Sequence, residues 1–117
     1  ANSRKAPGET GVYHREAAYI LQYDAYWEDP ADEKVNTEWV ENLRNDMQPY
    51  TQGAYVNYHD SQIKNPLVAY YGPNLAKLVD IKQKYDPNNV FNYPQSIPTE
   101  LSAELKSSLQ QLAIGVV

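Results

Sequence analysis

Two stretches of the chain alternate apolar and polar positions with the period of two that is typical of β-strands. The first runs from Val12 to Trp27, and its more aromatic face carries Tyr19, Leu21, Tyr23, Ala25 and Trp27. Pro30 marks its end, because proline cannot donate a hydrogen bond to a neighbouring strand. The second stretch is shorter and runs from Ala54 to Tyr58. The pattern therefore predicts one long strand and one short strand.

Other stretches repeat their apolar residues with the spacing of an amphipathic helix. One runs approximately from Thr37 to Met47, and another from Asn74 to Tyr85. Pro73 stands at the start of the second, where its missing backbone donor costs little. A shorter helical turn can open at Asn65-Pro66. After Pro98 a third helix is predicted, because four leucines fall on one stripe: Leu101, Leu105, Leu109 and Leu112.

The order of these elements predicts an α+β fold, in which amphipathic helices pack on a small antiparallel sheet. No convincing second domain or internal repeat is evident. Only two strands are found, and two strands make a marginal sheet in isolation. The rest of the sheet is therefore expected to come from residues outside this chain. Val90 and Phe91 form a short apolar pair that is expected to fill the core.

Composition narrows the classes of function. A net charge of −5 argues against nucleic-acid binding, which needs a basic surface, and against binding to an anionic membrane surface. No apolar run approaches the roughly 20 residues of a membrane span. The absence of cysteine excludes disulfides and thiolate chemistry, and no histidine or carboxylate cluster has metal-ligand spacing. Eleven tyrosines against one phenylalanine suit a polar pocket or an interface, although tyrosines also line strands.

The second half of the chain carries four short motifs in a fixed order. They are Tyr-x-Asn-Tyr at 55–58, Tyr-Tyr-Gly at 70–72, a helix closed by Asp86-Pro87 before Asn-Val-Phe, and Gln-Ser-Ile-Pro at 95–98. In this order and spacing they resemble the C-terminal, berberine-bridge-enzyme-like segment of FAD-linked oxidases in the vanillyl-alcohol-oxidase superfamily. No motif is decisive alone, and the order makes the signal specific.

The resemblance covers roughly residues 12–98 and implies a piece of a larger flavoenzyme. Residues 1–53 would be the C-terminal part of a substrate-binding domain. Residues 54–98 would be the berberine-bridge-enzyme-like segment, and residues 99–117 a helix outside the resemblance. FAD would be bound mainly by an N-terminal domain absent from this chain, which has no glycine-rich phosphate loop of its own. The compartment, cytoplasmic or secreted, stays open.

The resemblance also implies which residues form the site. Tyr58 is the candidate catalytic base, because the second tyrosine of the motif takes the substrate hydroxyl proton in the family. Tyr55 would bind substrate, and Asn57 and Gln95 would bind the cofactor. Strand alternation places Tyr55 and Asn57 on one face and Tyr58 on the other, unless a bulge re-aims one side chain. The alternatives are structural: a packed strand tyrosine for Tyr58 and a buried amide for Gln95.

A tyrosine base faces a large energetic problem. A phenol with a pKa of about 10 is ionised to roughly 0.1% at pH 7, a gap of about 4 kcal/mol. A cation or hydrogen bonds to the phenolate must lower that pKa, or proton transfer must be concerted with hydride loss. In relatives the group that does so lies in the rest of the substrate domain, which this chain lacks.

Three further features are expected to be structural. The His14-Arg15 pair matches a pair common at this place in the family. Tyr70-Tyr71-Gly72 is expected to be a packing turn, and His59 is expected on the strand face opposite Tyr58.

Two functions remain. The first is an FAD-dependent oxidoreductase that moves a hydride from a substrate C–H to flavin N5, with sugar or oligosaccharide alcohols as the first expected substrates and secondary-metabolite alcohols or amines as the second. The isolated fragment would be inactive and would bind FAD weakly or not at all. The alternative is a non-catalytic, stand-alone remnant that acts as a binding or structural module.

Overall fold

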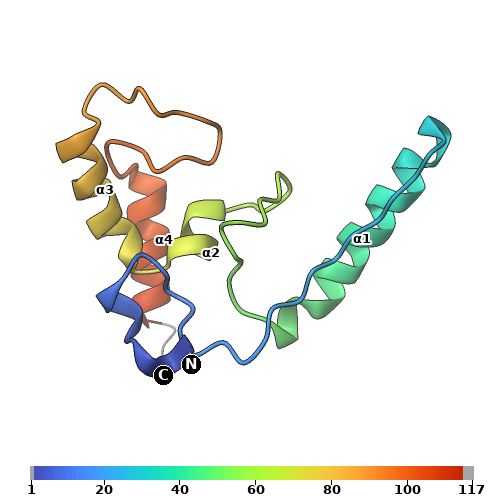
Figure 1. The fold of residues 1–117 in the computed structure, drawn as a ribbon, viewed down its shortest axis with the longest axis horizontal. Helices are drawn as coiled ribbons and strands as arrows, with labels where there is room; N and C mark the ends of the chain where they lie inside the picture. The colour runs from blue at the N-terminus through green and yellow to red at the C-terminus, as the bar shows by residue number, and fades with distance from the viewer. Residues whose placement is uncertain (1, 115–117) are drawn as a thin grey trace. The chain divides into compact units, whose positions relative to one another are not determined.

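The computed structural model describes residues 2–114 of the chain. Helices and irregular segments make up this part of the protein, and it contains no β-strand. The chain divides into two compact units: residues 18–52, and residues 1–17 together with 53–117. Figure 1 shows both units, and each is described by itself below.

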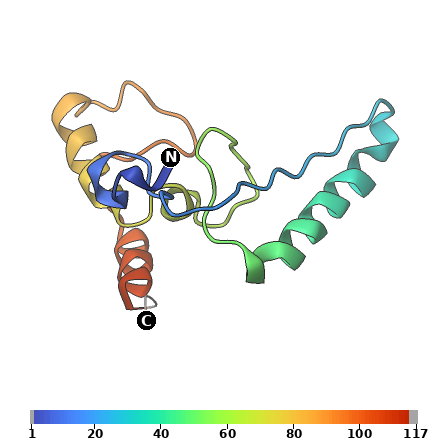
Figure 2. The ribbon, with the colours of Figure 1, turned by 60° about the horizontal axis from the view of Figure 1, so that its bottom comes forward.

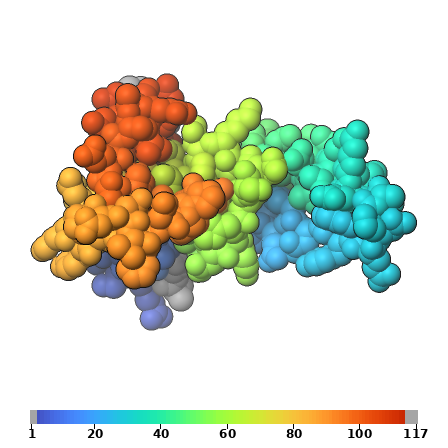
Figure 3. All heavy atoms as spheres, turned by 90° about the horizontal axis from the view of Figure 1, so that it is seen from above, coloured from blue at the N-terminus to red at the C-terminus, as the bar shows by residue number. Residues whose placement is uncertain are grey.

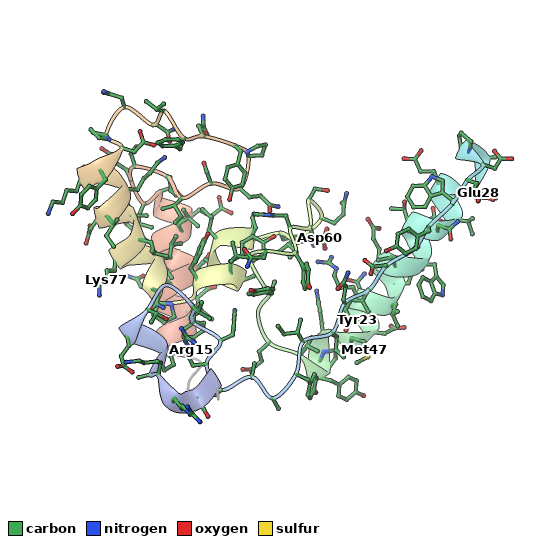
Figure 4. The ribbon with its side chains drawn as sticks, viewed as in Figure 1. Arg15, Tyr23, Glu28, Met47, Asp60 and Lys77 are labelled. Atoms are coloured by element: carbon green, nitrogen blue, oxygen red, sulfur yellow. The ribbon has the colours of Figure 1, made fainter. Side chains whose placement is uncertain are left out.

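The unit of residues 18–52 consists of an extended segment that runs back beside a long helix (Figures 1 and 2). The chain reverses at η3 (Pro30–Asp32), where the Asp29 carboxylate accepts a hydrogen bond of 2.9 Å from the Ala31 N–H. This turn continues directly into α1 (Glu33–Met47), which therefore begins earlier than its apolar pattern predicts. The helix passes into η4 (Gln48–Tyr50), so its predicted end at Met47 is confirmed. Figure 4 labels Tyr23 and Glu28 on the extended segment.

The other unit is built on α2 (Pro66–Tyr71), which contacts both α3 (Asn74–Tyr85) and α4 (Ala103–Ile114). The predicted helical turn at Pro66 and the predicted helix over residues 74–85 are thus confirmed. Three buried side chains form the core of the described residues: Tyr70, Leu75 and Val79. Leu75 and Val79 are four positions apart on α3, so they share one helix face.

The third predicted helix is also present, beginning after Ser102. The Ser102 hydroxyl accepts a hydrogen bond of 3.1 Å from the Leu105 N–H and so caps the first turn of α4. Three leucines of the predicted stripe are half-buried: Leu101, Leu105 and Leu109. Figure 3 shows α4 in red beside the orange segment that follows α3.

Two glycines allow the N-terminal segment to pass close to the corners around α2. Gly72, at the corner between α2 and α3, has a φ of +50°, and a Cβ atom there would lie 2.6 Å from the Tyr13 ring. Gly53 has a φ of +68°, and a Cβ atom there would lie 2.0 Å from the His14 ring. The same imidazole makes a 2.8 Å hydrogen bond to the Ala69 carbonyl through Nε2. The structural role expected for His14 agrees with this contact.

The predicted α+β fold with a small antiparallel sheet is wrong for the residues that the structure describes. Residues 19–27 are extended but join no ladder, and residues 55–58 form a turn closed by a 2.9 Å hydrogen bond from the Tyr58 N–H to the Tyr55 carbonyl. A strand is stable only when a neighbouring strand pairs its backbone groups, and residues 2–114 supply no such neighbour. The predicted alternation is seen in burial only over residues 23–26, where Tyr23 is half-buried and Tyr26 is 86% exposed, whereas Tyr19 and Ile20 are both exposed.

The expectation that Val90 and Phe91 fill the core is also wrong, because their side chains are 75% and 79% exposed. Polar groups fix this segment instead. The Asp86 carboxylate accepts hydrogen bonds from both backbone N–H groups, at 2.7 Å from Val90 and 3.0 Å from Phe91. The Lys82 ammonium group pairs with the same carboxylate. The Lys82 ammonium, followed by the two backbone donors, lowers the pKa of the Asp86 carboxyl below its ordinary value.

Candidate active site

Three of the four residues predicted for the site lie together on the turn of residues 55–58. The Asn57 amide donates a 2.8 Å hydrogen bond to the Tyr55 hydroxyl. The rings of Tyr55 and Tyr58 meet edge to face, with 5.5 Å between their centroids. Strand alternation predicts opposite faces for these two tyrosines, but the turn brings their rings into contact. The predicted separation of Tyr55 and Tyr58 onto opposite faces is therefore wrong, because it assumed a strand at these residues.

Tyr58 projects from the surface of this unit. Its residue is 54% exposed, and its hydroxyl has no hydrogen-bond partner among residues 2–114. Tyr55 is half-buried, and its hydroxyl accepts the hydrogen bond from Asn57. Of the two phenols on the turn, Tyr58 is thus the more exposed.

Gln95, the fourth predicted residue, lies in a different polar cluster. Its Oε1 accepts a 3.0 Å hydrogen bond from the Tyr70 hydroxyl, and its Nε2 donates a 2.8 Å hydrogen bond to the Asp60 carbonyl. The Asp60 N–H in turn donates to the Tyr70 hydroxyl at 3.3 Å. Figure 4 labels Asp60 on the loop that precedes α2. The second N–H of the Gln95 amide takes no part in these contacts. The predicted contact of Gln95 with a cofactor stays a prediction.

The same cluster includes His59, which the strand pattern predicts on the face opposite Tyr58. The His59 ring packs edge to face against Tyr70 and Tyr93, with centroid distances of 5.6 Å and 5.5 Å. Its Nε2 lies 3.2 Å from the Tyr93 hydroxyl. Sequence reasoning missed Tyr93, since it is 34 positions from His59 and carries no motif signal of its own.

Tyr71 is a further phenol near this cluster, but its environment does not suit a base. Burial raises the pKa of the Tyr71 hydroxyl above its ordinary value, and the nearby Tyr93 and Tyr70 act in the same direction. Its ring also lies edge to face against that of Tyr70, at 6.2 Å. Tyr71 therefore stays neutral at pH 7 and belongs to the packing of α2, as expected for the Tyr-Tyr-Gly motif.

An open hollow of about 550 Å³ lies between Leu67 on α2, the segment of residues 89–98 and Leu105 on α4, and it contains neither Tyr55 nor Tyr58. Among the described residues, no cluster of three histidine or carboxylate side chains could hold a metal ion. Within the same part of the chain, none of the helices has the length and apolar character to cross a membrane.

A comparison with protein families decides what this arrangement belongs to. Residues 54–98 match the family model described as berberine and berberine like. The segment belongs to this family. The match begins just before the turn that carries Tyr58 and ends after Gln95, so it contains all four candidate residues. The resemblance inferred from the motifs is confirmed.

Curated relatives extend the similarity beyond the segment. The chain is 41% identical to the uncharacterized FAD-linked oxidoreductase YgaK of Bacillus subtilis and 45% identical to YvdP, of the same description and organism, each over 84% of this chain and 22% of the relative. It is 38% identical to a chitooligosaccharide oxidase of Gibberella zeae, over 83% of this chain and 21% of that enzyme. The chain thus spans about a fifth of the length of these relatives. No solved structure matches it significantly.

Proposed function

We propose that this chain is the C-terminal part of a berberine-like FAD-dependent oxidoreductase that oxidises an alcohol group, with Tyr58 as the base that takes the hydroxyl proton. The observation that carries the proposal is the turn of residues 55–58 inside the family segment. It presents Tyr58 as the more exposed of its two phenols, with no hydrogen-bond partner among residues 2–114, while the Tyr55 hydroxyl accepts a hydrogen bond from Asn57.

The residues present fit one part of the cofactor. Asn57 is exposed beside Tyr58 and keeps its amide oxygen, and Gln95 keeps one N–H, so both can hydrogen-bond the polar edge of a flavin ring. FAD, when bound, supplies a hydride acceptor at flavin N5. The described residues offer no phosphate cradle, so the pyrophosphate is assigned to an N-terminal domain of the full-length protein.

In this mechanism the chain handles the proton. Tyr58, in its phenolate form, would take the substrate hydroxyl proton and become a neutral phenol while the C–H hydride passes to the flavin, and the edge-to-face contact with Tyr55 orients the Tyr58 ring. Tyr55, half-buried beside it, forms the substrate-side wall of the turn. A base positioned in this way contributes about 10²–10⁴-fold to rate.

The surface of the chain supports a piece of a larger enzyme over a stand-alone remnant. The chain exposes 9026 Å², whereas a compact monomer of 13.4 kDa exposes about 6,500 Å². Two separate compact bodies with the sizes of the two units would still expose only about 7,700 Å². The excess includes exposed apolar side chains such as Tyr26 and Phe91, which a partner domain would cover.

Sugar or oligosaccharide alcohols are the proposed substrates. The similarity to a chitooligosaccharide oxidase favours them over secondary-metabolite alcohols, and an exposed tyrosine ring such as that of Tyr58 suits stacking against the apolar face of a sugar. The small molecule and the flavin domain are thus the partners that the proposal requires.

The test uses the full-length protein purified with its flavin. It is mixed without oxygen with mono- and oligosaccharides, and bleaching of the flavin absorbance reports hydride transfer. We expect Tyr58→Phe to slow this reduction about 10²–10⁴-fold with unchanged flavin content. The control is Tyr85→Phe, which removes the same hydroxyl from an exposed tyrosine of α3 and should leave the rate unchanged. Full activity in Tyr58→Phe would exclude Tyr58 as the base, and absence of flavin from the full-length protein would refute the proposed function.

A further inference from the structure

Both ends of the turn that carries Tyr58 are attached to consecutive residues of α2. At the first end, the Ala54 N–H donates a 2.9 Å hydrogen bond to the Ala69 carbonyl. At the second end, the Asp60 N–H donates to the Tyr70 hydroxyl at 3.3 Å. The segment between these two attachments contains Tyr55, Asn57 and Tyr58. The last turn of α2 therefore holds both ends of this segment in place.

The attachment at Asp60 is a closed ring of three hydrogen bonds. The Tyr70 hydroxyl accepts from the Asp60 N–H and donates to Gln95 Oε1 at 3.0 Å, and Gln95 Nε2 donates back to the Asp60 carbonyl at 2.8 Å. Tyr70 is only 2% exposed, so water cannot readily replace its hydroxyl in this ring. The ring joins three segments that are far apart in the sequence: the loop at residue 60, α2 and the Gln-Ser-Ile-Pro motif.

Tyr58 itself has no comparable restraint. Its ring contacts Tyr55, a member of the same turn, and it is 54% exposed. The next residue, His59, is held by ring contacts to Tyr70 and Tyr93. The place of the Tyr58 hydroxyl within this unit is therefore set by what holds residues 59 and 60, and Tyr70 contacts both of them.

We infer that Tyr70 is a positioning residue for Tyr58, acting through the hydrogen-bonded ring with Asp60 and Gln95. The inference rests on the proposed role of Tyr58 as the base. It assigns a role in the reaction to Tyr70, a residue whose burial alone would indicate only a place in the core. A misplacement of about 1 Å in a reacting group can cost on the order of 10²-fold in rate, so a loosened turn should be visible in the chemical step.

Tyr70→Phe in the full-length protein tests this role. The substitution keeps the buried aromatic ring and removes the hydroxyl, which leaves the Asp60 N–H and Gln95 Oε1 without their shared partner. We expect the limiting rate of anaerobic flavin reduction to fall about tenfold or more, while the substrate concentration for half-saturation and the flavin content stay unchanged. The matched control is Tyr71→Phe, which removes the hydroxyl of the neighbouring residue, a group without a hydrogen bond among the described residues.

The decisive comparison repeats Tyr70→Phe in a Tyr58→Phe background. If Tyr70 acts through Tyr58, the second substitution should change the residual rate by less than about twofold, because the group that it positions is gone. An equal fall in both backgrounds would show a general structural effect and overturn the inference. An unchanged rate for Tyr70→Phe while Tyr58→Phe is inactive would also overturn the inference, but it would leave the proposed function intact. Full activity of Tyr58→Phe would overturn both the inference and the role of Tyr58 as the base.

A second variant covers the case in which Tyr70→Phe does not fold. Gln95→Met opens the same ring from the other side and keeps Tyr70 in the core. The same pair of backgrounds applies: the expected result is a fall in rate that disappears when Tyr58 is phenylalanine, with flavin content measured in each sample. Because Gln95 is also a proposed flavin contact, the comparison uses samples whose flavin content and absorption spectrum match those of the unsubstituted protein, and in these a fall of the same size in both backgrounds would again contradict positioning.

Discussion

Leu75→Ala tests whether the small core of α2 and α3 stabilises α2, the helix to which the candidate site is attached. Leu75 is fully buried at 0% exposure, one of three buried core side chains with Tyr70 and Val79. Truncation of a buried leucine loses its transfer free energy and leaves a cavity, at a cost of about 2.7–5.0 kcal/mol. Because the described core is small, its neighbours can partly collapse, and we take the low end, about 3 kcal/mol.

The assay is hydrogen exchange of the backbone amides of α2 and α3 in the full-length protein. A loss of about 3 kcal/mol in the opening free energy raises exchange roughly a hundredfold, since about 1.4 kcal/mol corresponds to a factor of ten. The control is Leu112→Ala on α4, where the residue is 37% exposed and the effect should stay below about tenfold. If Leu75→Ala changes exchange no more than Leu112→Ala does, the packing of Leu75 does not stabilise α2, and the reasoning is refuted.

Two further predictions concern the corners of this unit. Gly72→Ala should destabilise it by about 1–3 kcal/mol from backbone strain alone, with an added clash against the Tyr13 ring, and thermal unfolding should show this loss against Gly8→Ala, where the added methyl group meets nothing within 4 Å. The Asp86 carboxyl has a lowered pKa in the folded state, so its stabilising contribution is present above the unfolded pKa of about 3.9 and is lost as the pH falls through the folded value. Asp86→Asn should therefore flatten the acid limb of a plot of unfolding temperature against pH, and an unchanged limb would contradict the pairing with Lys82.

The helices could be predicted from the sequence because their signals are local. Residues 74–85 repeat their apolar positions every three to four residues, and α3 has these bounds. The strands could not, because a strand depends on a neighbour that the sequence of the strand does not contain. Residues 54–58 have the composition of a strand but form a turn, in which the backbone pairs locally between Tyr55 and Tyr58.

The candidate site shows the same limit. The motif at residues 55–58 identifies Tyr55, Asn57 and Tyr58 by resemblance, and the structure brings them into contact. Neither periodicity nor a motif could show that Gln95 meets Tyr70, which is 25 positions away. The one available signal was the tyrosine content: a buried tyrosine needs a partner for its hydroxyl, and Gln95 supplies it for Tyr70.

In the proposed mechanism, the exposure of Tyr58 and the burial of Tyr70 indicate that different groups set the ionisation and the position of Tyr58. A phenol at pH 7 needs about 4 kcal/mol to ionise, and a cation or hydrogen-bond donor at its oxygen must offset this cost. The described residues place no such donor at the Tyr58 hydroxyl, so the proposed mechanism requires one from outside them. The hydrogen-bonded ring around Tyr70 instead sets position. Substitutions in that ring should therefore lower the rate of flavin reduction at every pH without moving the limbs of the pH profile, whereas substitution of the required donor should move them.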